Sequence, residues 1–571
     1  MRSQNLYLMA ALSLAPVLAL AQPVIPATNA AVNASSYLTD VAQGSWFVIL
    51  GSGLGPSTIS IQAGLPFQPT LSGTSITFTP VAGGSPVSAL MYYTLATQVA
   101  GLLPSSTPVG DYKVTVTYNG KTSAPSAVKV VSRNFGIATE AANGQGPVQA
   151  TYNGMNLNRF TTTTIGGWSV RPAVPGDLMV LWGTGIGADT ASDIDGNTSG
   201  DQTSAGQVQV FVGGIAVTPG YAGRSPGSPG LDQINFTVPS QITPSCFVSL
   251  QVSAGGRLSN LGTIAVAQAG QGACSNAMLT ESQLQTLDNG GSLTVASFHL
   301  GKTATSLGSY GTLSQESFGG WFGKYTASTV STADFALATP GACFVADRTG
   351  TIDQLSYGLA PTSLDAGPQL TLNGPQASNI ALPRKSDNTY NATLYSSGIA
   401  GMGGSGQPTL VQGTYTVSGT GGANIGSFSA SVNLPGDFIW TNQQAMPASI
   451  PRSSPLNITW TGNSNGLVTI FGAALTATGG SLLNSTYAAT GFTCLASGSA
   501  GSFTVPAYIL QQLPAVSGNV TGNSLGTLSV FAVPDPAKAQ GFFTAPLTAG
   551  GSIDQGVFGF GIGANMVVGY N

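Results

Sequence analysis

The amino-acid sequence predicts an all-β protein: tandem immunoglobulin-like β-sandwich modules followed by one or more further β-sandwich domains. Three observations lead to this fold class. Only 6% of the 571 residues are charged and 78 are glycine, about twice the usual share. Short segments that alternate apolar and polar residues recur along the chain, separated by Gly- and Asn-rich turns. The first half of the chain also carries one pattern twice, which indicates a duplicated module.

The charge balance excludes several classes of protein. With 16 Lys and Arg against 20 Asp and Glu, the formal net charge is -4, so no basic surface is expected for nucleic acid. A hydrophobic content of 42% is too high for a disordered chain. Coiled coils need far more Glu and Lys. We therefore expect a folded protein with an uncharged polar surface.

The first 21 residues have the pattern of a secretory signal peptide. Arg2 supplies the basic start, residues 6–20 are apolar, and Ala19 and Ala21 precede the expected cleavage site before Gln22. No later segment has 18 consecutive apolar residues, so we expect no membrane span in the mature chain. The protein is therefore expected to be secreted, in the extracellular medium or on the cell surface.

The internal repeat defines two modules, at 22–133 and 134–275. The segment VILGSGLG at 48–55 returns as VLWGTGIG at 180–187, displaced by 132 positions. Further matches follow in the same order, with Gln98 and Pro104 returning as Gln233 and Pro239. The repeated glycines favour a turn or bulge, because the strand they follow does not lead into the helix that a nucleotide-binding loop requires.

Each module is predicted to consist of short strands. Residues 112–118 alternate between two faces and end at Asn119-Gly120, a strong hairpin signal, and residues 127–131 form the returning strand. The second module repeats this arrangement at 248–252, 255–256 and 264–266. Modules of this length, with short strands and frequent turns, are typical of an immunoglobulin-like sandwich.

Short motifs occur in a fixed order in both modules. They are AVNASSY at 31–37, GS at 44–45 and the segment at 48–55, then PGD at 175–177, GTGIG at 183–187, VQVFVGG at 208–214 and GLDQINFTVP at 230–239. In order and spacing, about 250 residues resemble the Solibacter-type uncharacterised C-terminal domain of secreted acidobacterial proteins. The resemblance implies an extracellular β-rich protein and brings no known activity or catalytic residues. Here the modules lie in the N-terminal half instead.

The remaining residues are also predicted to be strand-rich. Segments that alternate as strands lie at 370–372, 413–419, 428–432, 438–440, 456–460, 467–471, 501–505 and 528–531. A short helix is expected at 507–513, where the apolar residues do not alternate. We expect residues 276–352 to form a β-rich linking region or small domain, and 353–571 to form one or more C-terminal β-sandwich domains.

Four cysteines in an exported chain predict structural disulfides. They allow three pairings, and proximity in the sequence favours Cys246 with Cys274, which leaves Cys343 with Cys494. No C-x-x-C motif or neighbouring histidine supports a metal site instead.

Acidic residues gather in one short segment. It contains Asp189, Asp193, Asp195 and Asp201, with Asn197 between them. The alternation resembles the start of a calcium loop, although the glycine and glutamate that an EF-hand requires are replaced by Thr198 and Ser204. We treat these five residues as a candidate calcium site, the only cofactor expected. The alternative is a solvated loop.

Three aromatic residues lie between glycines at 319–325. Trp321, Phe322 and Tyr325 are candidates for an exposed platform that stacks on a sugar or another ligand. The other tryptophans discussed, Trp46, Trp182, Trp440 and Trp460, lie on predicted strands, where core packing is expected.

Few residues suit catalysis. His299 is the only histidine, and we expect it on a strand surface, because no Gly-x-Ser-x-Gly motif in the chain has the strand-to-helix context of a nucleophile elbow. We therefore expect a non-catalytic multidomain protein of structural, adhesive or extracellular-interaction type, whose partner is an unknown extracellular protein or glycan. The alternatives are a carbohydrate-binding accessory protein that uses Trp321, and a secreted hydrolase with an Asp-based site.

Overall fold

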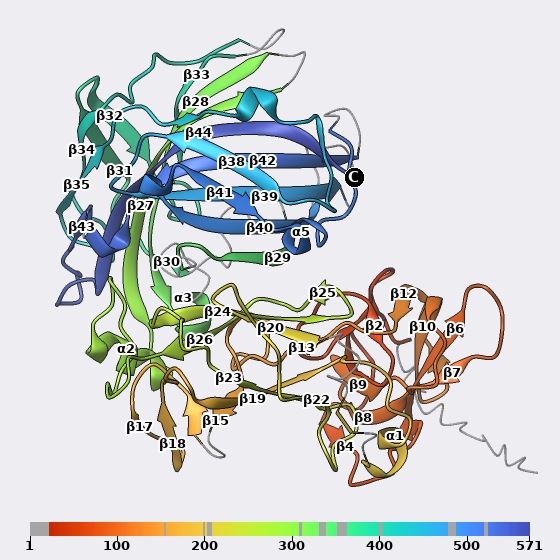
Figure 1. Cartoon of the computed structure of the whole chain (residues 1–571). Helices are drawn as coiled ribbons and strands as arrows, with labels where there is room; N and C mark the ends of the chain where they lie inside the picture. The colour runs from red at the N-terminus through yellow and green to blue at the C-terminus, as the bar shows by residue number, and fades with distance from the viewer. Residues whose placement is uncertain are drawn as a thin grey trace, which may run out of the picture.

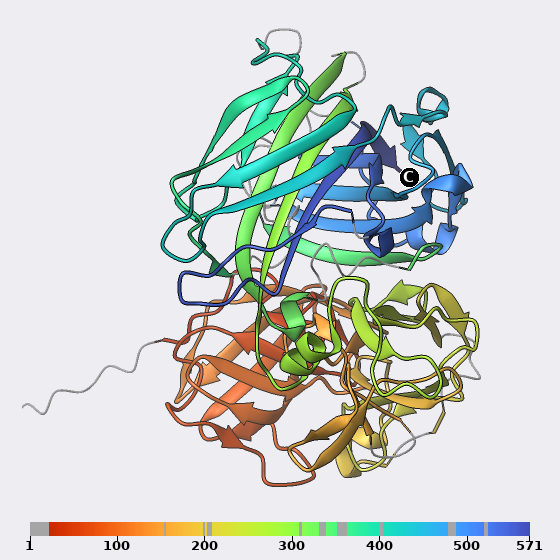
Figure 2. The same ribbon diagram turned by 90° about the vertical axis from the view of Figure 1, so that its left-hand side faces the viewer.

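The computed structural model describes residues 22–571 except 153–155, 198–199, 202–207, 308–310, 331–338, 351–361, 399–402, 478–486, 519–522 and 539. The described chain is all-β with a few short helices, as the sequence predicts. Two sandwich modules lie next to each other below a larger C-terminal domain (Figures 1 and 2). The predicted signal peptide, 1–21, lies outside the described residues.

The first module is a sandwich of two sheets. Its strands are β1 (Ala31–Asn33), β2 (Val41–Ala42), β3 (Trp46–Leu50), β4 (Ser60–Ile61), β5 (Thr70–Leu71), β6 (Thr74–Pro80), β7 (Val87–Ser88), β8 (Leu90–Thr94), β9 (Gln98–Leu102), β10 (Gly110–Tyr118), β11 (Lys121–Thr122) and β12 (Ser126–Val131). The sheets have the orders β1-β3-β9-β8-β4 and β2-β12-β10-β6-β5, with β11 beside β10 and β7 beside β6. Alternate residues, such as Phe47, Ile76 and Val114, fill the core between them.

The second module is also a sandwich. Its elements are β13 (Gly136–Ile137), β14 (Gly146–Pro147), β15 (Ala150–Tyr152), β16 (Asn156–Asn158), β17 (Thr163–Ile165), β18 (Trp168–Arg171), β19 (Leu178–Thr184), α1 (Ser192–Asp195), β20 (Val208–Val212), β21 (Ile215–Val217), β22 (Tyr221–Arg224), β23 (Asp232–Thr237), β24 (Ser245–Ala254), β25 (Arg257–Leu258) and β26 (Gly262–Val266). The orders are β17-β18-β16-β15-β19-β23-β22, with β13 beside β19, and β14-β26-β24-β20-β21, with β25 beside β24.

The sequence repeat is also a repeat of strand pairing. In the first module β1, β3 and β9 are neighbours, and β15, β19 and β23 are neighbours in the second. Trp46 at the start of β3 pairs with Leu102, and the corresponding Leu178 of β19 pairs with Thr237. The second module differs by the inserted strands β16, β17 and β18, which extend its first sheet.

The C-terminal domain begins with α2 (Glu281–Asp288) and has three sheets. Its further elements are β27 (Leu293–Ser306), β28 (Thr312–Tyr325), α3 (Ala327–Val330), β29 (Cys343–Gly350), β30 (Thr362–Ser363), β31 (Gln369–Gly374), β32 (Ala377–Pro383), β33 (Ala392–Ser396), β34 (Gly413–Gly419), β35 (Phe428–Leu434), β36 (Ile439–Trp440), η3 (Gln443–Ala445), β37 (Ser449–Ile450), β38 (Leu456–Thr461), β39 (Leu467–Ala477), β40 (Tyr487–Ser497), η4 (Gly498–Ala500), β41 (Ser502–Val505), α5 (Ala507–Leu510), β42 (Ser524–Val533), η5 (Pro536–Lys538), β43 (Phe542–Phe543) and β44 (Gln555–Tyr570). The helix predicted at 507–513 is present as α5, which ends at Leu510 and is followed by a turn.

An eleven-stranded sheet with the main order β29-β40-β39-β42-β44-β27-β28-β30 forms the centre of this domain. The sheets β32-β31-β34-β35 and β36-β38-β41 cover it. Phe558 and Val568 lie on the same face of β44, and each belongs to a different core. The large sheet therefore packs against the four-stranded sheet at one end of β44 and against the three-stranded sheet at the other.

The predicted division at 352 is corrected by the structure. Residues 276–352 do not form a separate linking region, because β27 and β28 lie in the middle of the eleven-stranded sheet. Strand β27 pairs in parallel with β44 from Val295 opposite Gln555 to Ser306 opposite Met566. The C-terminal domain is thus closed by the first and the last of its long strands.

Both predicted disulfides are present with the expected pairing. Cys246 of β24 is bonded to Cys274, which follows β26, across a separation of 28 residues. Cys343 of β29 lies directly opposite Cys494 of β40 and is bonded to it, across a separation of 151 residues.

No helix in the described part of the chain is long and apolar enough to cross a membrane.

Candidate functional site: the joint between the repeated modules

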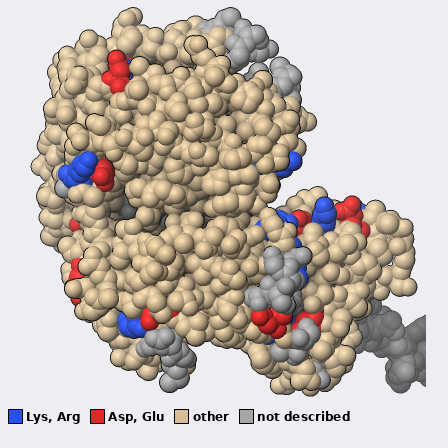
Figure 3. Space-filling model, in the orientation of Figure 1, with Lys and Arg blue, Asp and Glu red and all other residues tan. Residues whose placement is uncertain are grey.

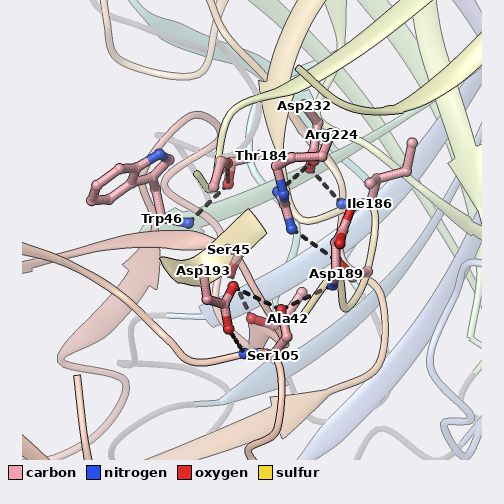
Figure 4. Close-up of polar contacts among 12 residues, drawn as sticks. Ala42, Ser45, Trp46, Ser105, Thr184, Ile186, Asp189, Asp193, Arg224 and Asp232 are labelled. Atoms are coloured by element: carbon pink, nitrogen blue, oxygen red, sulfur yellow. Dashed lines mark hydrogen bonds and ion pairs between the residues drawn. The ribbon is translucent and has the colours of Figure 1, made fainter. Parts of the chain in front are cut away.

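A network of buried polar groups holds the first module against the second. It comprises Trp46 and Ser105 of the first module and Thr184, Ile186, Asp189, Asp193, Arg224 and Asp232 of the second, drawn in Figure 4. We call these eight residues the module joint. The strands place it: β3 of the first module begins where β19 of the second ends, since the Trp46 amide donates to the Thr184 hydroxyl at 2.9 Å.

The ion pair between Arg224 and Asp232 lies within the second module and supports that module's side of the joint. Both side chains are fully buried, and the Arg224 Nη1 lies 2.5 Å from one carboxylate oxygen of Asp232. The other carboxylate oxygen accepts from the Ile186 amide at 2.7 Å, and Arg224 Nη2 donates to the Gly187 carbonyl at 3.0 Å. Burial raises the pKa of Asp232 to about 6, against the lowering effect of Arg224 and the Ile186 amide.

Ser105 is a second contact from the first module, besides Trp46. Asp193, held on the short helix α1, accepts from the Ser105 amide at 2.6 Å and from its hydroxyl at 2.9 Å. The Asp189 amide donates to the same hydroxyl oxygen at 2.9 Å. Burial also raises the pKa of Asp193, more than the hydrogen bonds from Ser105 lower it. Ser105 is buried, so its hydroxyl serves to join the modules and is closed to a substrate.

Further contacts support the module joint, among them the ion pair of Asp40 with Arg257, which also links the two modules. The Thr184 hydroxyl, which accepts from the Trp46 amide, donates to the Gly230 carbonyl at 2.6 Å. Arg133, between the modules, donates to the Ile186 carbonyl at 2.6 Å. Because opening the joint would leave the buried Asp193 carboxylate without its two donors on Ser105, separation of the modules is unfavourable. The arrangement therefore fixes the relative position of the two modules.

The structure places the candidate calcium residues at several separate positions. Asp189 and Asp193 belong to the module joint, and Asp201 accepts from the Ala222 amide at 3.0 Å. Asn197 is exposed, and the side chain of Asp195 lies outside the described residues. Among the residues whose side chains are described, no three of His, Cys, Asp and Glu converge on one point. Calcium binding by this segment stays a prediction.

The aromatic platform expected at 319–325 is corrected. Strand β28 directs successive residues to opposite faces, so Phe322 packs in the core beneath the four-stranded sheet. Tyr325 is buried with Cys246 and Cys274 in a second cluster, and its hydroxyl accepts from the half-buried Trp321 ring at 2.7 Å. Three exposed rings in one plane are therefore absent from this described strand. His299, half-buried on β27, lies edge-on to Trp321.

Core packing, expected for the other four tryptophans, is found for two of them. Trp440 and Trp460 are buried, as predicted. Trp46 and Trp182 are half-buried, because they lie on the outer faces of β3 and β19.

A second set of contacts, which the sequence did not indicate, holds the second module against the C-terminal domain. The Gln251 side chain bonds both the amide and the carbonyl of Val345, each at 3.0 Å. The rings of Phe211 and Tyr508 stack with centroids 4.6 Å apart. Asp288 of α2 accepts from the amides of Phe160 and Thr161. Burial raises its pKa, although these hydrogen bonds lower it.

Arg224, Asp232 and Ser105 are the functional residues that sequence reasoning missed. Arg224 and Asp232 are eight residues apart, at the ends of the adjacent strands β22 and β23. A charged pair flanking a Gly/Pro loop, in a chain with so few charges, was the available signal.

No family model matches the chain, and the comparison with curated proteins finds no match. Domains 5–6 of the S-layer protein SbsC align with 43% of this chain over 99% of their length, at 13% identity and a TM-score of 0.16. The Bacteroides ovatus protein SGBP-B of a mixed-linkage glucan utilization locus, solved with a heptasaccharide, aligns with 50% of this chain over 66% of its own, at 12% identity and a TM-score of 0.19.

Three chicken CNTN1 FN domains align with 96% of the chain over 99% of theirs, at 8% identity and a TM-score of 0.13. TM-scores this low carry no conclusion about function or ancestry.

Proposed function

We propose that the protein is a secreted, non-catalytic component of the extracellular space, of structural, adhesive or interaction type. The module joint carries this proposal. Asp193 and the Ser105 hydroxyl are bonded to each other across a buried interface, and Asp232 is paired with Arg224 inside the second module. This suits a rigid spacer and leaves these groups closed to a substrate. We also propose that both modules belong to the Solibacter-type family, on the motifs they share.

Rigidity extends to the C-terminal domain. Gln251 pairs with the edge strand β29 as another backbone would, and the ring of Phe211 is stacked on Tyr508. The face drawn in Figure 3 has few charged side chains between large uncharged areas. A rigid protein with an uncharged surface suits permanent contact with other neutral molecules.

The two alternatives are less well supported. We do not propose a carbohydrate platform at Trp321, because the rings of Phe322 and Tyr325 are buried in hydrophobic clusters. A hydrolase needs carboxylates in an open cleft, yet the carboxyl groups whose pKa burial raises are all held by protein groups: Asp193 and Asp288 at interfaces, and Asp232 in the ion pair within the second module. The groove on the second module, described below, has no carboxylate among its lining residues.

Fractionation of the native host, followed by N-terminal sequencing of the protein, tests the proposal. We expect the protein in the extracellular or cell-surface fraction with Gln22 as its first residue, and no turnover of a broad polysaccharide and peptide panel. Retention in the cytoplasm, or turnover that an Asp→Asn substitution abolishes, would contradict it.

A further inference from the structure

The second module carries an open groove at the end opposite the module joint. Its volume is about 640 Å³, and its lining residues are Gly176, Ile215, Ala216, Val217, Thr237, Val238, Pro239, Ser240 and Gln241. The lining is uncharged. A side chain added at Gly176 would meet nothing within 4 Å, so this end of the module is unfilled.

The first module has the same backbone structure at its corresponding end. The Gly44 amide donates to the Leu103 carbonyl at 2.9 Å, and the Leu103 amide donates to the Ser45 carbonyl at 3.0 Å. In the second module the Gly176 amide donates to the Val238 carbonyl, and the Val238 amide donates to the Asp177 carbonyl, both at 2.9 Å. We call this end of each module its tail: residues 42–45 and 102–105 in the first module, 174–177 and 237–240 in the second.

The first tail is occupied. A side chain added at Gly44 would lie 2.7 Å from Arg224 Nη2 and 3.2 Å from the Gly187 carbonyl oxygen, both of the second module. Ser105 is buried there, whereas the corresponding Ser240 is exposed. The groove is therefore the open counterpart of a surface that the molecule already uses once for docking a module.

The surface docked on the first tail is the far end of the second module, around residues 183–187. The corresponding end of the first module, its head, comprises 51–55 with the adjoining Val24, Leu50 and Ile59. These three apolar side chains are 61%, 48% and 55% exposed. Thr97 of the first module corresponds to Asp232 of the second. The Gly51 amide donates to the Thr97 carbonyl, and the corresponding Gly183 is the strand partner of Asp232. The head thus lacks the buried acid, is uncharged and exposes three apolar side chains.

We propose that the groove on the second module binds the head of the first module of a second copy of this chain. The partners match in character: Ile215, Val217 and Pro239 of the groove, with the exposed Leu178 beside it, face an apolar and uncharged head. The contact continues the end-to-end order of the existing module joint. Because head and tail are different surfaces, each added copy leaves one head and one tail free, and the chain of molecules can grow.

Sedimentation velocity of the full-length mature protein tests this inference. Wild type is expected to form larger species as its concentration rises. Thr237→Arg places a charge in the groove and Ile59→Arg places one on the head, so each variant alone should stay monomeric. Mixed in equal amounts, they should form dimers and nothing larger, since one supplies an intact head and the other an intact tail.

Ile439→Arg is the matched control, because Ile439 is comparably exposed at 56% but lies in the C-terminal domain. It should assemble like wild type. Ser240→Arg serves as a second tail variant if Thr237→Arg melts at a lower temperature than wild type. A wild type that stays monomeric up to its solubility limit, or variants that assemble unchanged, would overturn the inference. It goes beyond the proposed function, and its failure would leave the extracellular location untouched.

Discussion

Ser105 and Ser240 occupy the same position in the two modules and have different surroundings. Ser105 bonds Asp193 and the Asp189 amide across the module joint, and Ser240 is exposed. Ser105→Ala should lower the free energy of unfolding by about 1–3 kcal/mol, because a buried carboxylate oxygen loses its donor. Ser240→Ala should have no measurable effect. Urea denaturation of both variants checks this, and equal effects would refute it.

Arg224 provides the sharpest test of the buried pair. Arg224→Met leaves Asp232 buried without its cation, so we expect a loss of about 3–5 kcal/mol in the free energy of unfolding. Arg384→Met removes the partner of Asp365 at a solvent-accessible site, and there we expect a much smaller loss. Denaturant unfolding monitored by tryptophan fluorescence measures both. If Arg224→Met is as mild as Arg384→Met, the account of the pair is wrong.

Titration of the buried carboxylates should make the protein more stable at mildly acidic pH. Burial raises the pKa of Asp193, Asp232 and Asp288, that of Asp232 to about 6, so the folded state binds protons at a higher pH than the unfolded chain. Their contribution to stability is therefore gained as pH falls from about 7 through 6 and on towards the unfolded pKa of about 4.

The melting temperature, measured between about pH 5 and pH 8, should decrease as pH rises. Asp288→Asn should flatten part of this slope. The hydrogen bond from Arg384 lowers the pKa of Asp365, so this carboxyl group stays ionised over this range and does not affect the slope. A melting temperature that increases towards the alkaline end would contradict the assignment.

Among the elements, the repeated strands were predictable and the C-terminal sheet was not. Residues 48–55 and 180–187 can be matched by eye, and their strands, β3 and β19, have equivalent neighbours. By contrast, β27 is neighbour to β44, the last strand of the chain. Alternation predicts a strand and says nothing about its partner, so the boundary expected at 352 was wrong.

Strand β29 shows what a disulfide adds to an element. It is the edge of the eleven-stranded sheet, and Cys343 fastens it to β40 through Cys494. In the loop-entropy account, closing 151 residues stabilises by about 5 kcal/mol and closing 28 by about 3.6 kcal/mol. Replacing Cys343 and Cys494 by Ser should therefore lower the melting temperature more than replacing Cys246 and Cys274. Calorimetry of both double variants decides this; the reverse order would count against it.

At the scale of the whole molecule, sequence reasoning reached the fold class, the two modules and the disulfide pairing, and it missed how the parts are joined. The acidic segment at 189–201 is conspicuous in the sequence for its charge density. The structural role of Asp189 and Asp193 depends on their contacts with Ser105, which belongs to the other module. The platform at Trp321 failed because glycines flanking aromatic residues do not tell which face of β28 each ring takes. Such contacts arise from tertiary packing, which no local pattern encodes.

The central claim is that the module joint is closed and holds the two modules as one body. Hydrogen exchange at the amides of Ser105 and Asp189 tests it most directly, because each donates to a side chain of the other module. At a concentration where the protein is monomeric, we expect these amides to be as protected as those of β3 and β19, while the Ser240 amide exchanges rapidly. If Ser105 and Ser240 exchange at the same fast rate, the joint is open and the account is contradicted.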